Sequence, residues 1–245
     1  MNKSKLIFLD TETTGTGPKD RLCQVAYKFN GEEFESLFKP PLPIEIDAMA
    51  VAHITNKMVA DKEPFEKSKM RKHLQEILTE NILVAHNAKF DVEMLQRENL
   101  VVPKIIDTFK IAHHLDTEEK IPKYGLQYLR YFHELEVADA SAHSALGDVR
   151  VLEKVFEVLF SQMEKMLGDE EKVLEKMMEV SANPILFRKF NFGKYIGQQV
   201  SEVAKTDKNY LLWFFNQKIM ERERGEANDE NWIYTIDFYL NPKKK

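Results

Sequence analysis

The sequence predicts an α/β protein in which helices cover a mixed β-sheet. Three strand-like stretches follow one another within the first forty residues and are joined by short turns, which is typical of an antiparallel meander. The apolar spacing then changes to a helical period, and helices alternate with strands, which indicates β-α-β units. A concentration of aromatic residues from residue 185 onwards indicates a second, small domain.

The expected elements follow from apolar spacing and turn residues. Five short apolar stretches predict strands at residues 5–10, 21–29, 33–39, 82–85 and 105–107. Apolar residues recurring every three or four positions predict helices at residues 65–78, 90–98, 108–115, 125–135 and 145–162. Turns are expected at Gly15–Lys19 and at Asn30–Gly31, between the first three strands.

A change in composition near residue 165 predicts a domain boundary. There the chain becomes rich in acids, lysines and methionines in a helical segment that ends near Asn183–Pro184. We therefore expect one domain over residues 1–164, a helical linker over residues 165–185, and a small aromatic-rich domain over residues 186–245. That last domain is a candidate for nucleic-acid binding because its aromatic residues are interleaved with basic ones.

Composition restricts the classes of function. The formal charge of −5 and the pI near 5.9 give no dominant basic field, so charge alone does not indicate a nucleic-acid-binding protein. The single cysteine, Cys23, cannot form an internal disulfide and is expected to be a small buried apolar residue. The apolar run Leu6–Leu9 is too short for a signal peptide or a membrane span, which predicts a cytoplasmic protein without a membrane partner.

Two acids follow the first apolar strand. Asp10 and Glu12 are two positions apart, and side chains two apart on a strand project to the same side. Two carboxylates therefore converge at one strand end, which is a first indication of a metal site. The alternative is that both acids simply keep a sheet edge soluble.

Two further polar clusters lie at element ends. His86, Asn87 and Asp91 come where the fourth strand passes into a helix, although an acid at a helix start is also explained by the helix dipole. His143 and Asp148 are five residues apart at the start of a long helix. In a wholly helical segment they need not share a face, whereas a loop that holds His143 ahead of the helix would let both reach one point. The alternative is an ordinary surface hydrogen bond.

Together these clusters resemble the DnaQ-like (DEDDh) family of 3′-to-5′ exonucleases. The resemblance rests on FLDTETTG, HNAKFD and HSALGD, which occur in the family's order over roughly residues 4 to 162. Weaker similarity lies at DTFKIA and YGLQYL. The C-terminal FNFGKYIGQQV segment is similar to the small domain of exodeoxyribonuclease X-like proteins. The resemblance implies an RNase H-like fold with a five-stranded mixed sheet.

The resemblance also implies site residues and cofactors. It makes Asp10, Glu12, Asp91 and Asp148 ligands of two divalent metal ions, Mg²⁺ or Mn²⁺, which prefer carboxylate oxygens. It makes His143 the general base and Glu12 a catalytic residue as well as a ligand. The implied reaction is removal of nucleoside 5′-monophosphates from a 3′ end.

Substrate contacts are expected from four other residues of the motif regions: Thr13, His53, Asn87 and Phe90. Phe90 can instead belong to the core. The implied partner is nucleic acid, DNA rather than RNA, with replication or repair proteins as candidate protein partners. Two alternatives stay open at this stage: an RNA exonuclease on the same scaffold, because the motif residues bind features that DNA and RNA share, and a non-catalytic nucleic-acid-binding module.

Overall fold

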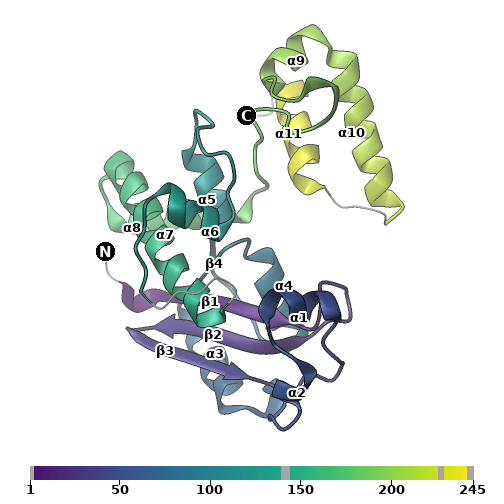
Figure 1. Cartoon of the computed structure of the whole chain (residues 1–245). Coiled ribbons are helices and arrows are strands. Elements are labelled where there is room, and N and C mark those ends of the chain that lie inside the picture. Colours follow the sequence, from purple (N-terminus) through teal and green to yellow (C-terminus); the bar gives the residue numbers. More distant parts are fainter. Residues whose placement is uncertain (1–2, 139–143, 226–228, 242–245) are drawn as a thin grey trace. The chain divides into compact units, whose positions relative to one another are not determined.

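The structure is a computed structural model that describes residues 3–138, 144–225 and 229–241 (Figure 1). The chain divides into two compact units. The first contains residues 1–115 and 121–182, and the second contains residues 116–120 and 183–245. No helix within the described ranges combines the length and the apolar composition needed to cross a membrane.

The first unit is built on a five-stranded mixed sheet, as the sequence predicts. Its strands are β1 (Leu6–Thr13), β2 (Leu22–Phe29), β3 (Glu32–Leu37), β4 (Ile82–Ala85) and β5 (Ile105–Asp107). Their spatial order is β3-β2-β1-β4-β5. β1 to β3 form the antiparallel meander, whereas β4 and β5 run parallel to β1. The short turns and the longer helical crossovers account for these two pairing modes.

Helices cover both faces of this sheet (Figure 1). One face carries α5 (Thr108–Leu115), α6 (Leu126–Phe132), α7 (Ala145–Leu167) and α8 (Glu170–Ala182). The other carries α3 (Lys69–Glu80) and α4 (Lys89–Arg97). Because side chains alternate along β1, Leu6 and Phe8 belong to the first core and Ile7 and Leu9 to the second. β1 is therefore buried on both faces and is a rigid base for the residues that follow Leu9.

α7 is the longest helix and packs across β1 and β2. The Phe8 and Phe156 rings meet edge to face with centroids 5.4 Å apart, a favourable geometry for aromatic pairs. The helix ends at Gly168, whose φ of 69° is the left-handed conformation that glycine adopts without strain. α7 thus extends to Leu167, beyond the end of the segment 145–162 that apolar spacing predicts.

Shorter elements complete the first unit. They are the 3-10 helices η1 (Lys3–Lys5) and η2 (Phe65–Lys67) and the helices α1 (Ile46–Ala52) and α2 (Asn56–Val59). α1 and α2 enclose a small apolar cluster that contains Cys23 and Ile44. Cys23 is fully buried, and burial raises the pKa of its thiol to about 12, so it is the buried apolar residue that the sequence predicts.

The segment expected as a linker contains α8, which packs in the first unit. Val173 and Met177 are buried in the core that α8 shares with α5 and α7. The Ser181 hydroxyl accepts a hydrogen bond from the backbone N–H of Asp107 at 2.8 Å, which ties the end of α8 to β5. The structure therefore groups residues 165–182 with the first unit; the division of the chain into functional domains stays a prediction.

The second unit consists of η3 (Gly193–Tyr195), α9 (Val200–Thr206), α10 (Lys208–Glu223) and α11 (Glu230–Leu240). Its core is largely aromatic, and Phe190 and Trp232 stack at its centre with ring centroids 5.1 Å apart. Isolated bridges join Lys189 to Gln199 and Phe190 to Ile196. The large contact area of each aromatic side chain explains how so few residues form a core.

Candidate active site

The carboxyl end of β1 carries the first two predicted acids. Asp10 lies opposite Ala26 and Glu12 opposite Gln24 in the antiparallel ladder with β2. Both are half-buried, and both project from the sheet face that α7 covers, because they alternate in register with Leu6 and Phe8. The ladder becomes irregular between Glu12 and Thr13, where the chain leaves the sheet.

Asp91 is brought to this strand end by the turn between β4 and α4. Asn87 occupies the left-handed region in that turn, with a φ of 60°, which asparagine tolerates better than most residues. Asp91 lies in the first turn of α4 and is buried. Its Oδ1 accepts a hydrogen bond from the Thr11 hydroxyl at 2.7 Å, which links α4 directly to β1.

Asp148 reaches the same site from the first turn of α7. Its backbone N–H donates to the Ser144 carbonyl at 2.8 Å as the helix begins. Its Oδ1 accepts a hydrogen bond from Nε2 of Gln127 on α6 at 2.5 Å. Three separate segments of the chain thus place the four acids close enough for their charges to act on one another.

The electrostatics show that these carboxylates share one site. Burial raises the pKa of Asp10 well above its usual range, and the charges of Asp91, Glu12 and Asp148 raise it further. Burial also raises the pKa of Glu12 to about 7, with further contributions from Asp148 and Asp91. The pKa of Asp91 rises to about 7 because of burial, although the Thr11 hydrogen bond opposes the shift. Such a concentration of negative charge requires either protons or cations for compensation.

The donor set suits hard divalent cations. All four side chains offer carboxylate oxygens, which Mg²⁺ and Mn²⁺ prefer over nitrogen or sulfur. Within the described ranges, no three acidic, histidine or cysteine side chains already form a preassembled metal site. The Thr11 hydroxyl holds the Asp91 carboxylate, and the Gln127 amide holds that of Asp148. The chemistry of the four donor groups fits a divalent cation.

Replacing Glu12 by Gln tests this electrostatic account. Because the folded-state pKa of Glu12 lies above its unfolded value, ionising Glu12 costs stability, and the cost grows as the pH rises from about 4.5 to about 7. In EDTA we expect Glu12→Gln to raise the melting temperature at pH 8 by several degrees but to have little effect at pH 5. With saturating Mn²⁺ the order at pH 8 should reverse, because wild type gains more from the metal.

Comparing the variant with wild type at each pH cancels the effect of His86, whose buried imidazole titrates in the same range. Burial lowers the pKa of His86 to about 4, so the folded protein loses stability as the pH falls from 6.5 towards 4. Melting curves that give the same difference between variant and wild type at pH 5 and pH 8 would contradict a charged, crowded Glu12.

His86 has a structural role. Its Nε2 donates to the Tyr124 carbonyl at 2.8 Å, and its Nδ1 is 2.9 Å from the Thr108 hydroxyl. Both ring nitrogens are thus engaged within the fold. The histidine of the HNAKFD motif fixes the loop before α6 against the end of β4.

The predicted substrate-contact residues have different surroundings. Thr13 is buried, and its hydroxyl donates to the Gly15 carbonyl at 2.7 Å. His53 and Asn87 are exposed, each with a positive φ at a turn. Phe90 packs against the core beneath α4, which agrees with its alternative core assignment. Contacts of these four residues with substrate stay predictions, and His143, the predicted base, falls outside the described residues.

Asp107 is a site residue that motif reasoning passed over. It is buried at the end of β5, and its Oδ1 accepts hydrogen bonds from the backbone N–H groups of Asn87 at 2.9 Å and Phe109 at 3.0 Å. The carboxylate therefore holds the turn that presents Asp91. Its position directly after an apolar strand, in the DTFKIA segment, was the available signal.

We expect Asp107→Ala to raise the Mn²⁺ concentration that activity requires, although Asp107 is not one of the four predicted ligands. Losing the carboxylate leaves two backbone N–H groups without their acceptor, so the turn before α4 should loosen. The Mn²⁺ concentration for half-maximal activity should rise several-fold, while activity at saturating Mn²⁺ recovers substantially. Asp107→Asn is the matched control, because its side-chain oxygen can still accept both bonds. Equal metal requirements in Asp107→Ala and wild type would contradict the positioning role.

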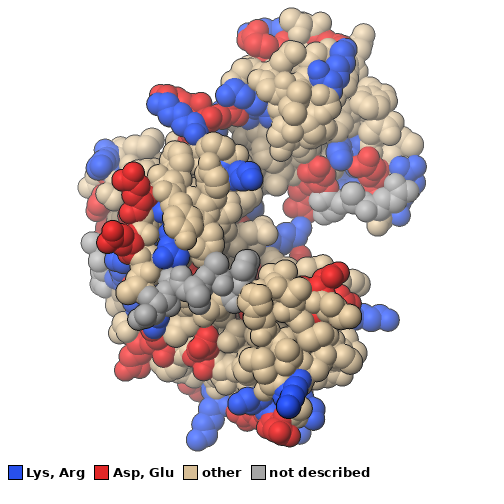
Figure 2. All heavy atoms as spheres, in the orientation of Figure 1, with Lys and Arg blue, Asp and Glu red and all other residues tan. Residues whose placement is uncertain are grey.

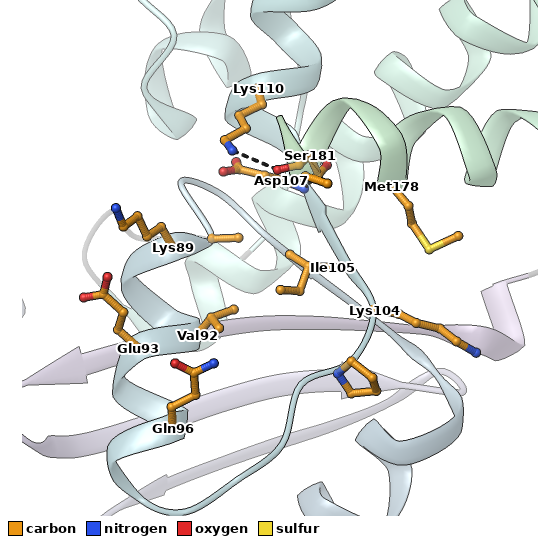
Figure 3. Close-up of a pocket in the computed structure, with 13 residues that line it drawn as sticks. Lys89, Val92, Glu93, Gln96, Lys104, Ile105, Asp107, Lys110, Met178 and Ser181 are labelled. Carbon is orange, nitrogen blue, oxygen red and sulfur yellow. Dashed lines mark hydrogen bonds between the residues drawn. The ribbon is translucent and has the colours of Figure 1, made fainter. Parts of the chain in front are cut away.

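A cavity of about 510 Å³ lies on the other side of α4 (Figure 3). Lys89, Glu93 and Gln96 line it from α4, and the Lys110 ammonium donates to the Ser181 carbonyl at 2.8 Å along its rim. Asp107 reaches this cavity, but none of the four acids lines it. The candidate catalytic centre is therefore the strand-end carboxylate cluster, and the cavity is a separate feature of the fold.

The visible face of the first unit has no single basic field. In Figure 2, Lys and Arg side chains are scattered among Asp and Glu side chains over that face. This distribution agrees with the net charge of −5.

Comparison with known proteins gives consistent similarities. A family model described as "Exonuclease" matches residues 7–156, and one described as "Exodeoxyribonuclease X-like C-terminal" matches residues 190–218. Exodeoxyribonuclease 10 of Escherichia coli (strain K12) is 31% identical over 180 residues, covering 74% of this chain and 75% of that protein. DNA polymerase III subunit epsilon of Buchnera aphidicola subsp. Acyrthosiphon pisum is 29% identical over 190 residues, covering 69% and 78%.

Among solved structures, exonuclease X in complex with 5′ overhanging duplex DNA superposes with a TM-score of 0.57 at 27% sequence identity. The match covers 72% of this chain and 99% of that chain. The shared architecture confirms the RNase H-like fold that the sequence motifs imply.

Proposed function

The chain belongs to the exonuclease family whose model spans residues 7–156, and from that membership we propose that it is a metal-dependent 3′-to-5′ exonuclease acting on DNA. One observation carries the proposal. Asp10, Glu12, Asp91 and Asp148 come from three separate segments, and their charges act on one another at one strand end. Acids that destabilise the fold when they ionise, and whose pKa values are strongly shifted, are typical of functional sites.

The proposed reaction gives a role to each of the side chains at this site. Asp10, Glu12, Asp91 and Asp148 would hold two divalent cations, Mg²⁺ or Mn²⁺. When bound, these cations would supply Lewis-acid polarisation of the scissile phosphodiester and neutralise charge that develops on its oxygens. Gln127 orients the Asp148 carboxylate, and Thr11 orients that of Asp91. His143 would take the proton from the attacking water, a role that neutral imidazole performs well near pH 7.

DNA is the proposed substrate because the relatives favour it. The similar Escherichia coli protein is named for deoxyribonuclease activity, and the similar solved structure is a complex with duplex DNA. The four intact acids argue against the alternative of a non-catalytic binding module. Replication and repair proteins remain proposed partners, since the other relative is a DNA polymerase III subunit.

The test offers 5′-end-labelled single-stranded DNA, duplex DNA and RNA of one sequence to the full-length protein with Mn²⁺. We expect a ladder of products shortened from the 3′ end on DNA and none in EDTA. A ladder on RNA alone would make the chain a ribonuclease. The absence of cleavage of all three substrates, in a protein that still binds Mn²⁺, would contradict the catalytic proposal.

A further inference from the structure

α10 in the second unit carries apolar side chains on the side away from its core. Leu211 and Phe214 are buried, whereas the neighbouring Leu212 and Trp213 are 42% and 56% exposed. The other tryptophan of the chain, Trp232, is 3% exposed at the centre of the core. Core packing therefore accounts for Trp232 and leaves Trp213 unexplained. An exposed tryptophan in a small domain is typical of a binding surface.

Trp213 lies at one end of a continuous row of rings and a cation. Its ring centroid is 5.6 Å from that of Tyr210, which is 4.8 Å from that of Tyr195. The Lys194 ammonium lies 4.6 Å from the centre of the Tyr195 ring and 5.8 Å from that of the Tyr210 ring. We call Lys194, Tyr195, Tyr210 and Trp213 the aromatic–lysine surface.

Asp207 fixes the geometry of this surface. Its Oδ2 accepts hydrogen bonds from the Tyr195 hydroxyl at 2.5 Å and from the Lys194 ammonium at 3.1 Å. Its Oδ1 accepts from the backbone N–H of Tyr210 at 3.1 Å and so caps α10. One carboxylate therefore holds both tyrosines and the lysine, and a ligand would not have to order them on binding.

Positive charge near this surface comes from individual lysines rather than from the unit as a whole. Residues 183–245 contain 11 Lys and Arg against 8 Asp and Glu, and three of those 11 are Lys243–Lys245, which lie outside the described residues. Lys194 and Lys208 are both exposed near the N-terminal end of α10. Exposed aromatic faces beside ammonium groups match the chemistry of single-stranded nucleic acid, whose bases stack and whose phosphates pair with lysine.

We propose that the aromatic–lysine surface binds single-stranded DNA of the substrate, by stacking of bases on Trp213 and Tyr210 and by contact of Lys194 with phosphate. This inference rests on the proposed exonuclease function for the identity of the ligand. Stacking tolerates any base, so binding should depend on strand length and on salt but little on sequence. The first unit would then perform hydrolysis, while the second would increase the time for which the strand stays bound to the protein.

The test measures binding and turnover of full-length Trp213→Ala. In EDTA, where no cleavage occurs, we expect the affinity for a labelled 30-nucleotide single strand to fall about tenfold, as loss of one stacked base implies. With Mn²⁺, KM for the same strand should rise several-fold while kcat stays near wild type. A trinucleotide, which offers the aromatic–lysine surface few bases to stack, should be cleaved equally by variant and wild type.

Two further variants separate stacking and charge from general damage. Tyr234→Ala is the matched control, because Tyr234 is a 37%-exposed aromatic residue on α11 of the same unit and should retain wild-type affinity. Lys194→Gln should make the salt dependence of binding shallower by roughly one counterion. Wild-type melting temperature in Trp213→Ala would show that the fold is intact.

Unchanged DNA affinity in folded Trp213→Ala would overturn the inference, and the surface would then be a candidate for protein docking. Equal losses in Trp213→Ala and Tyr234→Ala would overturn it as well, because the effect would not be specific to the surface. Binding in EDTA is measured without cleavage, so it tests the aromatic–lysine surface independently of the proposed nuclease activity. A protein without that activity can still bind or fail to bind the strand.

Discussion

Asp10→Asn is expected to abolish exonuclease activity, with a loss of at least about a thousandfold. An amide keeps the size of the side chain but removes the negative charge that would hold both cations. Electrophilic stabilisation by bound cations contributes several kcal/mol, and each 1.36 kcal/mol is a factor of ten in rate. Asp148→Asn should have a similar effect, since both acids act on the same site. The measurement is the rate of release of nucleotides from end-labelled DNA at saturating Mn²⁺.

The same variant should fold normally and be more stable than wild type without metal. Burial and three neighbouring acids raise the pKa of Asp10. Ionising Asp10 therefore costs the folded protein stability, and an uncharged amide avoids this cost. Calorimetric titration should show weakened Mn²⁺ binding in Asp10→Asn. Asp61→Asn, at an exposed position, is the control and should retain wild-type binding and activity. Wild-type metal affinity together with retained cleavage in Asp10→Asn would refute the four-acid assignment.

Local sequence patterns were sufficient to predict the sheet and the pairing of Asp10 with Glu12 at one strand end. Strand periodicity and turn residues are local properties, so the meander of β1 to β3 and the later helix alternation could be read directly. The convergence of Asp10 and Glu12 follows from the two-residue repeat of a strand. Bringing Asp91 and Asp148 to them required the family resemblance, because spacing along the chain does not show which strand ends meet.

The features that the sequence did not predict are tertiary hydrogen bonds. Gln127 contacts Asp148 across 21 positions, and Asp107 accepts from Asn87 across 20. Gln127 has no local pattern that marks it, and the position of Asp107 after an apolar strand does not by itself show which backbone groups its carboxylate holds. For His86 the local pattern pointed to a site residue, because the histidine lies at a strand end. Its hydrogen bonds to Thr108 and Tyr124 show instead that it has a structural role. Composition predicts a linker at residues 165–185; Val173 and Met177 of this segment are buried in the first unit, a packing that composition does not show.

His143→Ala is expected to slow hydrolysis by roughly a hundredfold or more, as loss of a general base typically does. His143 lies outside the described residues, so the prediction depends on the HSALGD motif and on the position of Asp148 at the start of α7. Metal binding should be unchanged, because imidazole is not among the four proposed ligands. This separates His143→Ala from Asp10→Asn, which should lose activity and metal affinity together.

The pH dependence gives the decisive measurement for His143. Imidazole accepts a proton only when neutral, so wild-type activity should fall below about pH 6 as His143 becomes protonated. Saturating Mn²⁺ is essential in this experiment, because Glu12 and Asp91 have pKa values of about 7 in the metal-free protein and their titration would otherwise limit metal binding over the same range. His143→Gln is the matched variant, because glutamine can hydrogen-bond to water but cannot take its proton. It should be as slow as His143→Ala. The residual activity of both variants should not decrease below pH 6. If either variant cleaved DNA at the wild-type rate from pH 5.5 to pH 8, a base other than His143 would have to activate the water.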